Sequence, residues 1–521
     1  MNTLPASYLH IGKAADLADP GDRRLFRFFE ILPGLLSWGT LLGSVIFSWL
    51  FPSWTAFFMM AFVVYWVLRM LYFLFYLAAG YRKMRRHEKK DWLRELSRLN
   101  ASVSPLGITS WKDVYHLVIM PSYKEPLEVL RASFSALART RYPKDRIIVV
   151  LGIEQREGQE ARDKAAVLLR EFGSSFFHFL VTEHPQDILG EITGKGSNES
   201  FAARAAKTEI IDALKIPYNR VIVSSLDADT VVFPQYFSCL SWHYIAAKHP
   251  TRTSFQPIPL YINNIWQAPP ISRVFAFSST FWHTMNQQRP EKLITFSSHA
   301  MSFSALVDVG FKAVNVVSDD SRIFWQCFFK YHGDYRVESL HYPVSMDANV
   351  APRLFGTMKN IYRQHRRWAY GCGEIAYAFF GFVKDKSISR SRKFSLGFEL
   401  LESHWSWATS SILLFMLGHL PSILGGEEFS RTLLSYNLPR FTSDILTISM
   451  IGVVMVAALS ISLLPPRKPS FGKLRVIWFG AQWFILPFVM IFFMALPALE
   501  AQTRWMLGRY LGFWVTPKTR R

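Results

Sequence analysis

The sequence predicts an α/β domain held between membrane-spanning helices at the two ends of the chain. Apolar blocks with almost no charge lie near both ends, whereas roughly residues 95–400 have the charge pattern of a soluble domain. In that middle part, short apolar runs alternate with longer amphipathic ones, which is typical of strands alternating with helices. The 521 residues are enough for several structural units, because a domain takes roughly 150 residues.

The N-terminal block predicts a helical hairpin in the membrane. Residues 31–80 contain one charged residue, Arg69, and are interrupted near Pro52. Each half is close to the roughly 20 residues that cross a bilayer. Basic clusters at residues 23–27 and 82–90 flank the block, which places both ends in the cytoplasm by the positive-inside rule, with residues 1–30 as a cytoplasmic segment. A buried soluble hairpin is the alternative.

The C-terminal block, residues 404–500, predicts about three membrane segments. Residues 405–426, 445–466 and 476–499 carry no Asp, Glu, Lys or Arg. Three crossings would put the tail, residues 501–521, outside the cell, yet the lysines and arginines of that tail favour the cytoplasm. The sequence leaves the side of the tail open.

The middle of the chain predicts a largely parallel sheet. Apolar runs at 116–120, 146–151, 177–181 and 220–226 are expected as strands, and residues 159–171 and 198–214 as helices. In such sheets ligands bind beyond the carboxyl ends of the strands.

The composition limits the classes of partner that the protein could bind, but it does not identify one of them. The formal net charge of +20 suits nucleic acid, anionic lipid or an anionic small molecule such as a nucleotide. Cys239, Cys327 and Cys372 lie far apart and lack the spacing of a zinc site, so reduced thiols are expected.

Acidic side chains follow the strand predicted at 220–226. Asp227 and Asp229 stand in the run SSLDADT, and two carboxylates at a strand end suit magnesium or manganese shared with substrate phosphates. A solvated turn or a helix cap is the alternative. A second pair, Asp319 and Asp320, opens a predicted helix, where one acid could act as a general base or could simply cap the helix.

Further polar groups lie at other strand and helix ends. Tyr123 and Glu125 stand in the loop PSYKEP, Glu154 follows the second strand, and Lys195 precedes a helix in the run GKGSN. The loop could hold a base or ribose and the helix start a phosphate, although ordinary connecting loops would look alike.

A helix predicted over 356–380 carries Gln364, Arg367 and Trp368 at i, i+3, i+4 spacing, so the three share one face. That face offers an amide, a guanidinium for phosphate oxygens and a flat ring for a sugar. The alternative is a basic interfacial helix lying on anionic lipid.

In this order, the Pro-x-Tyr-x-Glu loop, Asp-x-Asp, the acidic pair and Gln-x-x-Arg-Trp resemble the membrane-integrated family 2 glycosyltransferases, which include cellulose, chitin and hyaluronan synthases. The resemblance covers about residues 110–380, and the flanking apolar blocks match the family's layout. It implies a GT-A-type, Rossmann-like cytoplasmic catalytic domain at residues 95–345, followed by interfacial helices at 346–403. The tail run FWVTPK also looks like the Phe-x-Val-Thr-x-Lys gating loop of cellulose synthase.

The resemblance also implies roles for individual residues. Asp320, the last residue of Ser-Asp-Asp where the family has Thr-Glu-Asp, would be the catalytic base, and Asp229 would bind the metal. The donor site would comprise Tyr123, Glu125, Glu154, Lys195, Asp227 and Asp229. The acceptor and diphosphate site would comprise Asp319, His299, Gln364, Arg367 and Trp368. The gating-like residues would be Phe513, Val515, Thr516 and Lys518.

The expected function is inverting transfer of a sugar from a nucleotide-diphosphate sugar, with a UDP-sugar as the expected donor, to an acceptor hydroxyl. Extension of a polysaccharide is the leading expectation. Single transfer to a lipid-linked acceptor is the alternative, and a non-catalytic basic membrane scaffold is a third possibility. The expected cofactor is magnesium or manganese, and the expected partners are a glycan or lipid-linked acceptor and the lipid bilayer, not nucleic acid. The expected location is the cytoplasmic membrane, and the sequence names no partner subunit.

Overall fold

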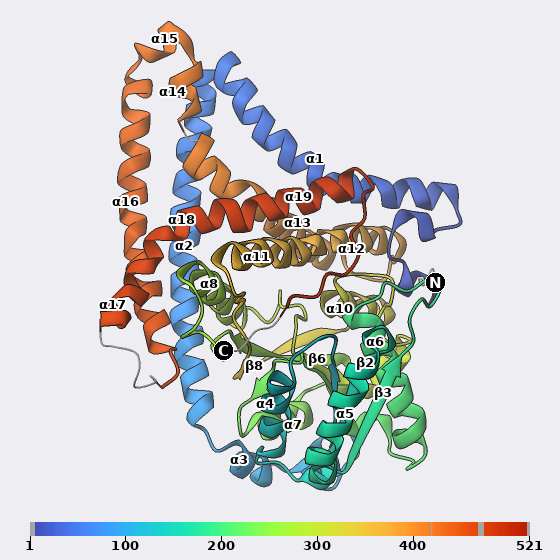
Figure 1. Ribbon diagram of the computed structural model, residues 1–521. Coiled ribbons are helices and arrows are strands. Elements are labelled where there is room, and N and C mark those ends of the chain that lie inside the picture. The colour runs from blue at the N-terminus through green and yellow to red at the C-terminus, as the bar shows by residue number, and fades with distance from the viewer. Residues whose placement is uncertain (1–5, 418, 467–473, 518–521) are drawn as a thin grey trace.

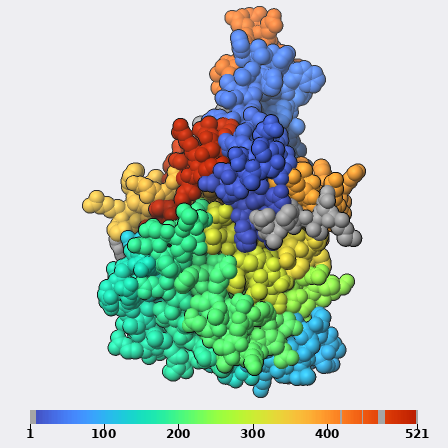
Figure 2. All heavy atoms as spheres, turned by 90° about the vertical axis from the view of Figure 1, so that its right-hand side faces the viewer, coloured from blue at the N-terminus to red at the C-terminus, as the bar shows by residue number. Residues whose placement is uncertain are grey.

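The computed structural model describes residues 6–417, 419–466 and 474–517. A broad α/β domain occupies one end of the molecule, and long helices from both ends of the chain extend from it as a narrower stalk (Figures 1 and 2). The predicted fold class, an α/β domain between apolar helices that could cross a membrane, is confirmed.

One mixed sheet of eight strands forms the centre of the domain, in the order β3-β2-β1-β4-β7-β6-β8-β5. The strands are β1 (Tyr115–Pro121), β2 (Ile147–Glu154), β3 (His178–His184), β4 (Val221–Ser225), β5 (Val231–Val232), β6 (Thr253–Leu260), β7 (Ala300–Ser302) and β8 (Arg336–Ser345). The four predicted strands are β1 to β4, and they pair in parallel. β2 is buried along its whole length, as the β-branched run Ile147–Val150 suits a strand covered on both faces.

The sheet is largely parallel, as expected: β6 and β8 pair in parallel and keep the direction of β4, and only the short strands β5 and β7 run against it. β7 is antiparallel to both β4 and β6, and β5 is antiparallel to β8. β7 has three residues and β5 has two, so neither contains a run long enough to show an alternating pattern.

Helices cover the sheet and connect its strands (Figure 1). Those of the domain are α3 (Trp92–Arg98), α4 (Leu127–Ala138), α5 (Gln159–Phe172), α6 (Lys195–Ala206), α7 (Tyr236–Ala246), α8 (Pro270–Asn286), α9 (Phe303–Asp308) and α10 (Asp319–Lys330). The predicted helix at 198–214 begins earlier, at Lys195, and changes to a π-helix over Lys207–Asp212. Cys239, Cys327 and Cys372 are free and buried, as expected.

Three helices lie between the domain and the stalk: α11 (Leu354–Ala369), α12 (Gly373–Lys384) and α13 (Arg390–Ile412). The single helix predicted over 356–380 is therefore two helices joined by a 3₁₀ turn at Tyr370–Cys372. Gly371 and Gly373 weaken the helix at this point, and the Trp505 ring lies where a Cβ of Gly373 would be, 2.2 Å from it.

The stalk consists of α1 (Pro20–Leu50), α2 (Pro52–Lys89), α14 (Leu420–Leu424), α15 (Gly426–Ser430), α16 (Leu433–Ser462), α17 (Leu474–Ala481), α18 (Leu486–Val489) and α19 (Leu496–Met506). A π-helix, η14 (Met490–Ala495), joins α18 to α19. Pro52 starts α2, where its missing N–H costs no helical hydrogen bond.

Among the described residues, four helical segments are long and apolar enough to cross a membrane: Pro20–Leu50, Pro52–Lys89, Leu433–Ser462 and Ile477–Met506. The first two correspond to the predicted hairpin, and the last two overlap most of the segments predicted at 445–466 and 476–499. The segment predicted at 405–426 falls on the end of α13 and on α14 and is not one of these four.

The tail after α19 returns to the start of α1. The Arg27 guanidinium donates to the carbonyls of Trp505 and Met506 at 2.8 and 2.6 Å, and the Tyr510 hydroxyl donates to Glu30 at 2.9 Å. The tail then runs toward the domain (Figure 1). The N-terminal end of α1, the tail and the domain therefore lie on the same side of the stalk.

Candidate active site

The carboxyl ends of three neighbouring parallel strands meet at one edge of the sheet. β1 leads into Tyr123, β2 ends at Glu154, and β4 leads into Asp227 and Asp229. All four residues line one cavity of about 1070 Å³. The strand geometry ends at Ser225, and Asp227 to Thr230 form a turn closed by a 2.8 Å hydrogen bond, so the turn rather than strand alternation presents both carboxylates.

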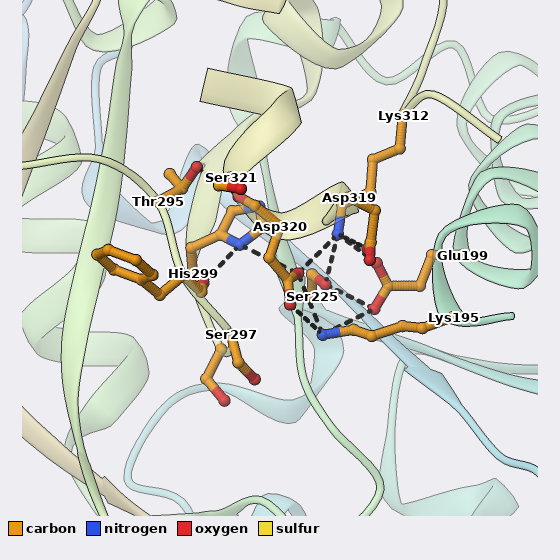
Figure 3. Close-up of polar contacts among 12 residues, drawn as sticks. Lys195, Glu199, Ser225, Thr295, Ser297, His299, Lys312, Asp319, Asp320 and Ser321 are labelled. Carbon is orange, nitrogen blue, oxygen red and sulfur yellow. Dashed lines mark hydrogen bonds and ion pairs between the residues drawn. The ribbon is translucent and has the colours of Figure 1, made fainter. Parts of the chain in front are cut away.

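Lys195, the first residue of α6, joins the two acidic motifs. Its ammonium lies 2.7 Å from Asp227. The same ammonium lies 2.8 Å from Asp320 (Figure 3). The next residue, Gly196, allows α6 and α10 to approach closely, because a Cβ at this position would lie 2.7 Å from the Asp319 Cβ. The close approach of α6 and α10 therefore brings together residues more than a hundred positions apart in the chain.

A second lysine, Lys312, stands behind the acidic pair (Figure 3). Its ammonium donates to Asp319 at 3.2 Å and to Asp320 at 3.1 Å, and it also binds the buried Glu199 carboxylate. Ser225 completes the cluster by donating to Glu199 at 2.6 Å. Two lysines thus offset part of the negative charge of the four carboxylates gathered around them, which stabilises charges that are buried.

The two members of the acidic pair have opposite pKa shifts. Burial acts to raise the pKa of Asp320, but Lys195 and Lys312 outweigh it and hold that pKa well below its ordinary value. Burial, followed by the neighbouring Asp320 charge, raises the pKa of Asp319. Asp320 lines the cavity with its side chain 22% exposed, whereas that of Asp319 is 4% exposed. Asp320 is therefore the ionised member that a substrate can reach.

The cavity wall near β2 offers an aromatic ring and a buried carboxylate. Glu154 accepts from the Asn198 amide at 3.0 Å and lies 3.2 Å from the Arg156 guanidinium, which also covers the Tyr123 ring at 3.8 Å. Glu125 lines the cavity too, although its carboxylate accepts hydrogen bonds from Ser122 and from the Tyr123 N–H of its own loop. This wall could hold a flat, polar group such as a nucleobase.

α11 brings its predicted face to the same cavity, which Gln364, Arg367 and Trp368 all line. Trp368 stacks on Phe275 with ring centroids 5.5 Å apart. Burial lowers the pKa of Arg367, opposed by Asp227, Asp319 and Asp320, and a guanidinium remains charged at neutral pH in any case. Arg367 thus adds a fixed positive charge opposite the acids.

His299 lies beside the base candidate but does not line the large cavity. Its Nδ1 is 3.7 Å from Asp320 and 2.9 Å from the Phe296 carbonyl, and the side chain is 1% exposed. Burial lowers the pKa of His299 to about 3, so the ring is neutral at physiological pH. The structure gives His299 a place behind Asp320.

The C-terminal tail covers the start of α6. The Phe513 ring fills the space where a Cβ of Gly194 would be, 2.6 Å away, and the Arg367 guanidinium lies 4.8 Å from that ring. Val515 and Thr516 line the cavity. Lys518, the last gating-like residue, lies outside the described residues.

Among the described residues, two groups of carboxylates could hold a divalent cation. Glu199, Asp319 and Asp320 have carboxylate oxygens within 4.8 Å of one another, but the Lys312 ammonium already contacts all three, so a cation would have to displace it. Asp227 and Asp229 lie at the cavity wall, and one Asp229 oxygen accepts the Asp347 N–H at 2.9 Å. The Lys195 ammonium contacts Asp227, so Asp229 is the carboxylate of this pair that better fits magnesium or manganese, which one or two carboxylates and substrate phosphates can hold.

Sequence reasoning missed several polar residues of this site, chiefly Glu199, Lys312, Asn198 and Arg156. Glu199 lies one helical turn after Lys195, so the two share a face of α6, and this spacing was a usable signal. Lys312 precedes the acidic pair in an ordinary loop context, and its sequence position carries no comparable signal.

No protein-family model matches the chain, and no curated protein matches it. Among solved structures, a mannosyltransferase from Pyrobaculum calidifontis in complex with GDP-mannose and Mn²⁺ is 15% identical; the match covers 83% of this chain and 98% of that one, with a TM-score of 0.38. TarS residues 1–349 from S. aureus in complex with UDP is 11% identical, with coverage of 76% and 93% and a TM-score of 0.36. Both are distant similarities, with TM-scores below 0.5.

Proposed function

We propose that this protein is a membrane-bound, inverting glycosyltransferase that moves a sugar from a nucleotide-diphosphate sugar to an acceptor hydroxyl. The observation that carries the proposal is Lys195, which joins Asp227 of the Asp-x-Asp turn and Asp320 of the acidic pair at the wall of one cavity. The resemblance of the motifs to family 2 glycosyltransferases implies that these residues lie together. A non-catalytic scaffold would not need lysines and carboxylates buried together beside a cavity, so the enzyme is the better proposal.

The donor is proposed to lie along the edge of the sheet. Tyr123 and Glu154 would contact the base, and Asp227 the ribose. Asp229 would hold a magnesium or manganese ion, with Asp227 beside it, and the ion would supply positive charge to the diphosphate. Lys195 and Arg367 would contact phosphate oxygens, because both are cations that face the cavity.

Asp320 is proposed to act as the base. It would accept the proton of the acceptor hydroxyl while that oxygen forms a bond to the anomeric carbon. The bond from that carbon to the diphosphate oxygen breaks, the electron pair leaves with the nucleotide diphosphate, and the configuration inverts. Phosphate oxygens near Lys195 would compete with Asp320 for its ammonium, which would raise the pKa of Asp320 and make it a better base.

Trp368 and Gln364 would flank the acceptor. The Trp368 ring is held by its stack on Phe275, and the Gln364 carbonyl accepts from Asn349 at 3.2 Å. The cavity volume of about 1070 Å³ is at the upper end of ordinary ligand pockets, which favours a site for two substrates. Extension of a polysaccharide is proposed, and product length from purified enzyme separates it from single transfer.

The experiment that tests the function is a donor panel. The full chain in lipid nanodiscs is incubated with UDP- and GDP-linked sugars, with magnesium, with manganese or with a chelator, and release of nucleoside diphosphate is measured. We expect one donor class to be consumed, and the chelator to suppress that consumption. A chain that leaves every donor intact under all conditions would refute the proposal.

A further inference from the structure

The cavity has a mouth far from the donor edge. Tyr65 and Tyr72 of α2, Trp282 of α8 and Phe398 of α13 all line the cavity. The same four side chains are 41%, 41%, 42% and 59% exposed, so they stand where the cavity opens to the surroundings. Because α2 is long and apolar enough to cross a membrane, this mouth opens toward the lipid, and aromatic side chains are favoured at that boundary.

The mouth carries a small excess of positive charge. Arg289 and Lys292 both contact Glu399, at 3.1 and 2.8 Å, and Arg69 is ion-paired with Glu402 one turn further along α13. Three cations therefore face two carboxylates, and all five groups line the cavity. An anionic head group such as a phosphate diester would be attracted to this cluster.

A short stretch of chain connects the mouth to the acids. Thr295 donates to the Asp320 carbonyl at 2.6 Å, and Ser297 donates to the Asp227 carboxylate at 2.6 Å. Only two residues lie between Lys292 and Thr295, so their Cα atoms lie within about 11 Å. A sugar attached to a phosphate held near Lys292 would therefore extend toward Asp320.

The outer face of α2 beside the mouth is apolar. Leu68, Leu71 and Phe75 are exposed there, in the part of the helix that would lie in the bilayer. A hydrocarbon chain could remain against this face while its head group enters the mouth. The surface thus matches the parts of a lipid-linked sugar in order: the apolar face matches the hydrocarbon chain, the cationic cluster matches the phosphate, and the acids of the site match the sugar.

Building on the proposed function, we infer that the acceptor is a sugar joined through phosphate to a lipid chain, and that it enters sideways from the membrane through this mouth. Arg289 and Lys292 bind the phosphate, and the sugar hydroxyl reaches Asp320. The lipid chain stays in the bilayer throughout the transfer.

The test uses the full chain in nanodiscs and three additions: an isoprenoid-phosphate-linked sugar, the same sugar without lipid, and plain phosphatidylglycerol. The donor found in the panel is supplied, and its hydrolysis without acceptor is measured separately. We expect the lipid-linked sugar alone to be converted to product. Replacing both Arg289→Ala and Lys292→Ala should raise the KM for that acceptor by about tenfold or more, because charged hydrogen bonds are lost.

Two controls keep the result specific. Nucleoside diphosphate affinity and acceptor-free hydrolysis should stay unchanged in the double variant. The charge-conserving variant Lys292→Arg should have an acceptor KM close to that of the parent. Arg390→Ala, an exposed arginine at the start of α13 that does not line the cavity, should behave like the parent. A photoreactive lipid-linked sugar should label peptides of α2 or α13 in the unaltered chain.

The outcomes separate the two claims. Equal use of the lipid-free sugar, an unchanged acceptor KM in the double variant, or photolabelling away from both helices would overturn the lateral-entry inference and leave glycosyl transfer standing. Protection from photolabelling by phosphatidylglycerol as strong as that by the lipid-linked sugar would make the mouth a general lipid site, which also overturns it. No consumption of any donor would refute the proposed function itself, and the inference with it.

Discussion

At the scale of single residues, Lys195 and Lys312 determine the state of the site. Each contacts Asp320, and together they keep its pKa low although the side chain is largely buried. Lys312 is 5% exposed and its own pKa is raised, because Glu199 and Asp320 outweigh the effect of burial. Lys312 is a positioning residue: it stands behind the acids and does not line the large cavity.

Removing this charge should change the pH dependence of the reaction. In Lys312→Met one of the two lysines that lower the pKa of Asp320 is lost, so that pKa rises, by about 1–3 units for a neighbouring opposite charge. A base works only when deprotonated, so the acid limb of the kcat profile, which reports the pKa of the base in the substrate complex, should move to higher pH. Lys312→Arg, which keeps the charge, should move it less. An acid limb at the same pH in Lys312→Met would show that Lys312 does not act on the base.

The motifs of the sequence predicted which residues approach the cavity but not how they are connected. Tyr123, Glu154, Asp227 and Asp320 line it because strand and helix ends converge there, and such ends can be recognised from apolar runs. Lys312 contacts Glu199 and Arg156 covers the Tyr123 ring, and periodicity does not encode such contacts between distant segments. His299, expected at the acceptor, instead lies behind Asp320.

At the scale of elements, the tail and α6 are packed so closely that a single methyl group should disturb them. A Cβ at Gly194 would lie 2.6 Å from the Phe513 ring, although the backbone there is extended and accepts any residue. Gly194→Ala should therefore displace the tail and raise the donor KM. If the tail is the gating-like segment, Phe513→Ala should raise it as well.

The double variant tests this contact directly. In Gly194→Ala with Phe513→Ala the ring that would clash is absent, so the added methyl group should have little further effect. The measurement is donor KM for the four proteins, and the coupling between neighbours in contact is expected at about 0.5–3 kcal/mol. Strictly additive effects would contradict the packing of the tail on α6.

Strands were predicted correctly where the apolar run was long, and they were missed where the strand was too short to show a pattern. β1 to β4 follow from apolar runs at least four residues long, and their parallel pairing follows from the intervening helices. β5 and β7 are too short to be recognised, and they alone run against the other six strands, because β7 is antiparallel to both of its neighbours and β6 pairs with β8 in parallel. The helix predicted over 356–380 divides at Gly371 and Gly373, where Trp505 from a distant helix packs.

At the scale of the whole molecule, the structure bears on the side of the tail. The hydrogen bonds of Arg27 and Tyr510 hold the tail against the start of α1, beside the domain. Pro52 at the hairpin tip lies next to Gly425 at the other end of the stalk. If the stalk crosses the membrane, the tail and the domain lie on the same side of it, and the basic residues of the tail favour the cytoplasm as that side.

Site-directed labelling tests this arrangement. The three natural cysteines are buried, so single exposed cysteines can be added as Lys13→Cys, Gly512→Cys and Glu428→Cys. In inside-out vesicles a membrane-impermeant maleimide should label the first two and not the third. The reverse should hold in right-side-out vesicles. Labelling of Gly512→Cys from the same side as Glu428→Cys would contradict the shared location of tail and domain.

The central claim is that Asp320 removes the proton from the acceptor hydroxyl, and Asp320→Asn tests it most directly. The change keeps the shape of the side chain and removes its ability to accept a proton. Sugar transfer and nucleoside diphosphate affinity are measured on the same preparation. The account predicts a loss of roughly 10²–10⁴-fold or more in kcat, with the affinity retained, as for a removed general base. Transfer at the parental rate by Asp320→Asn would contradict the account.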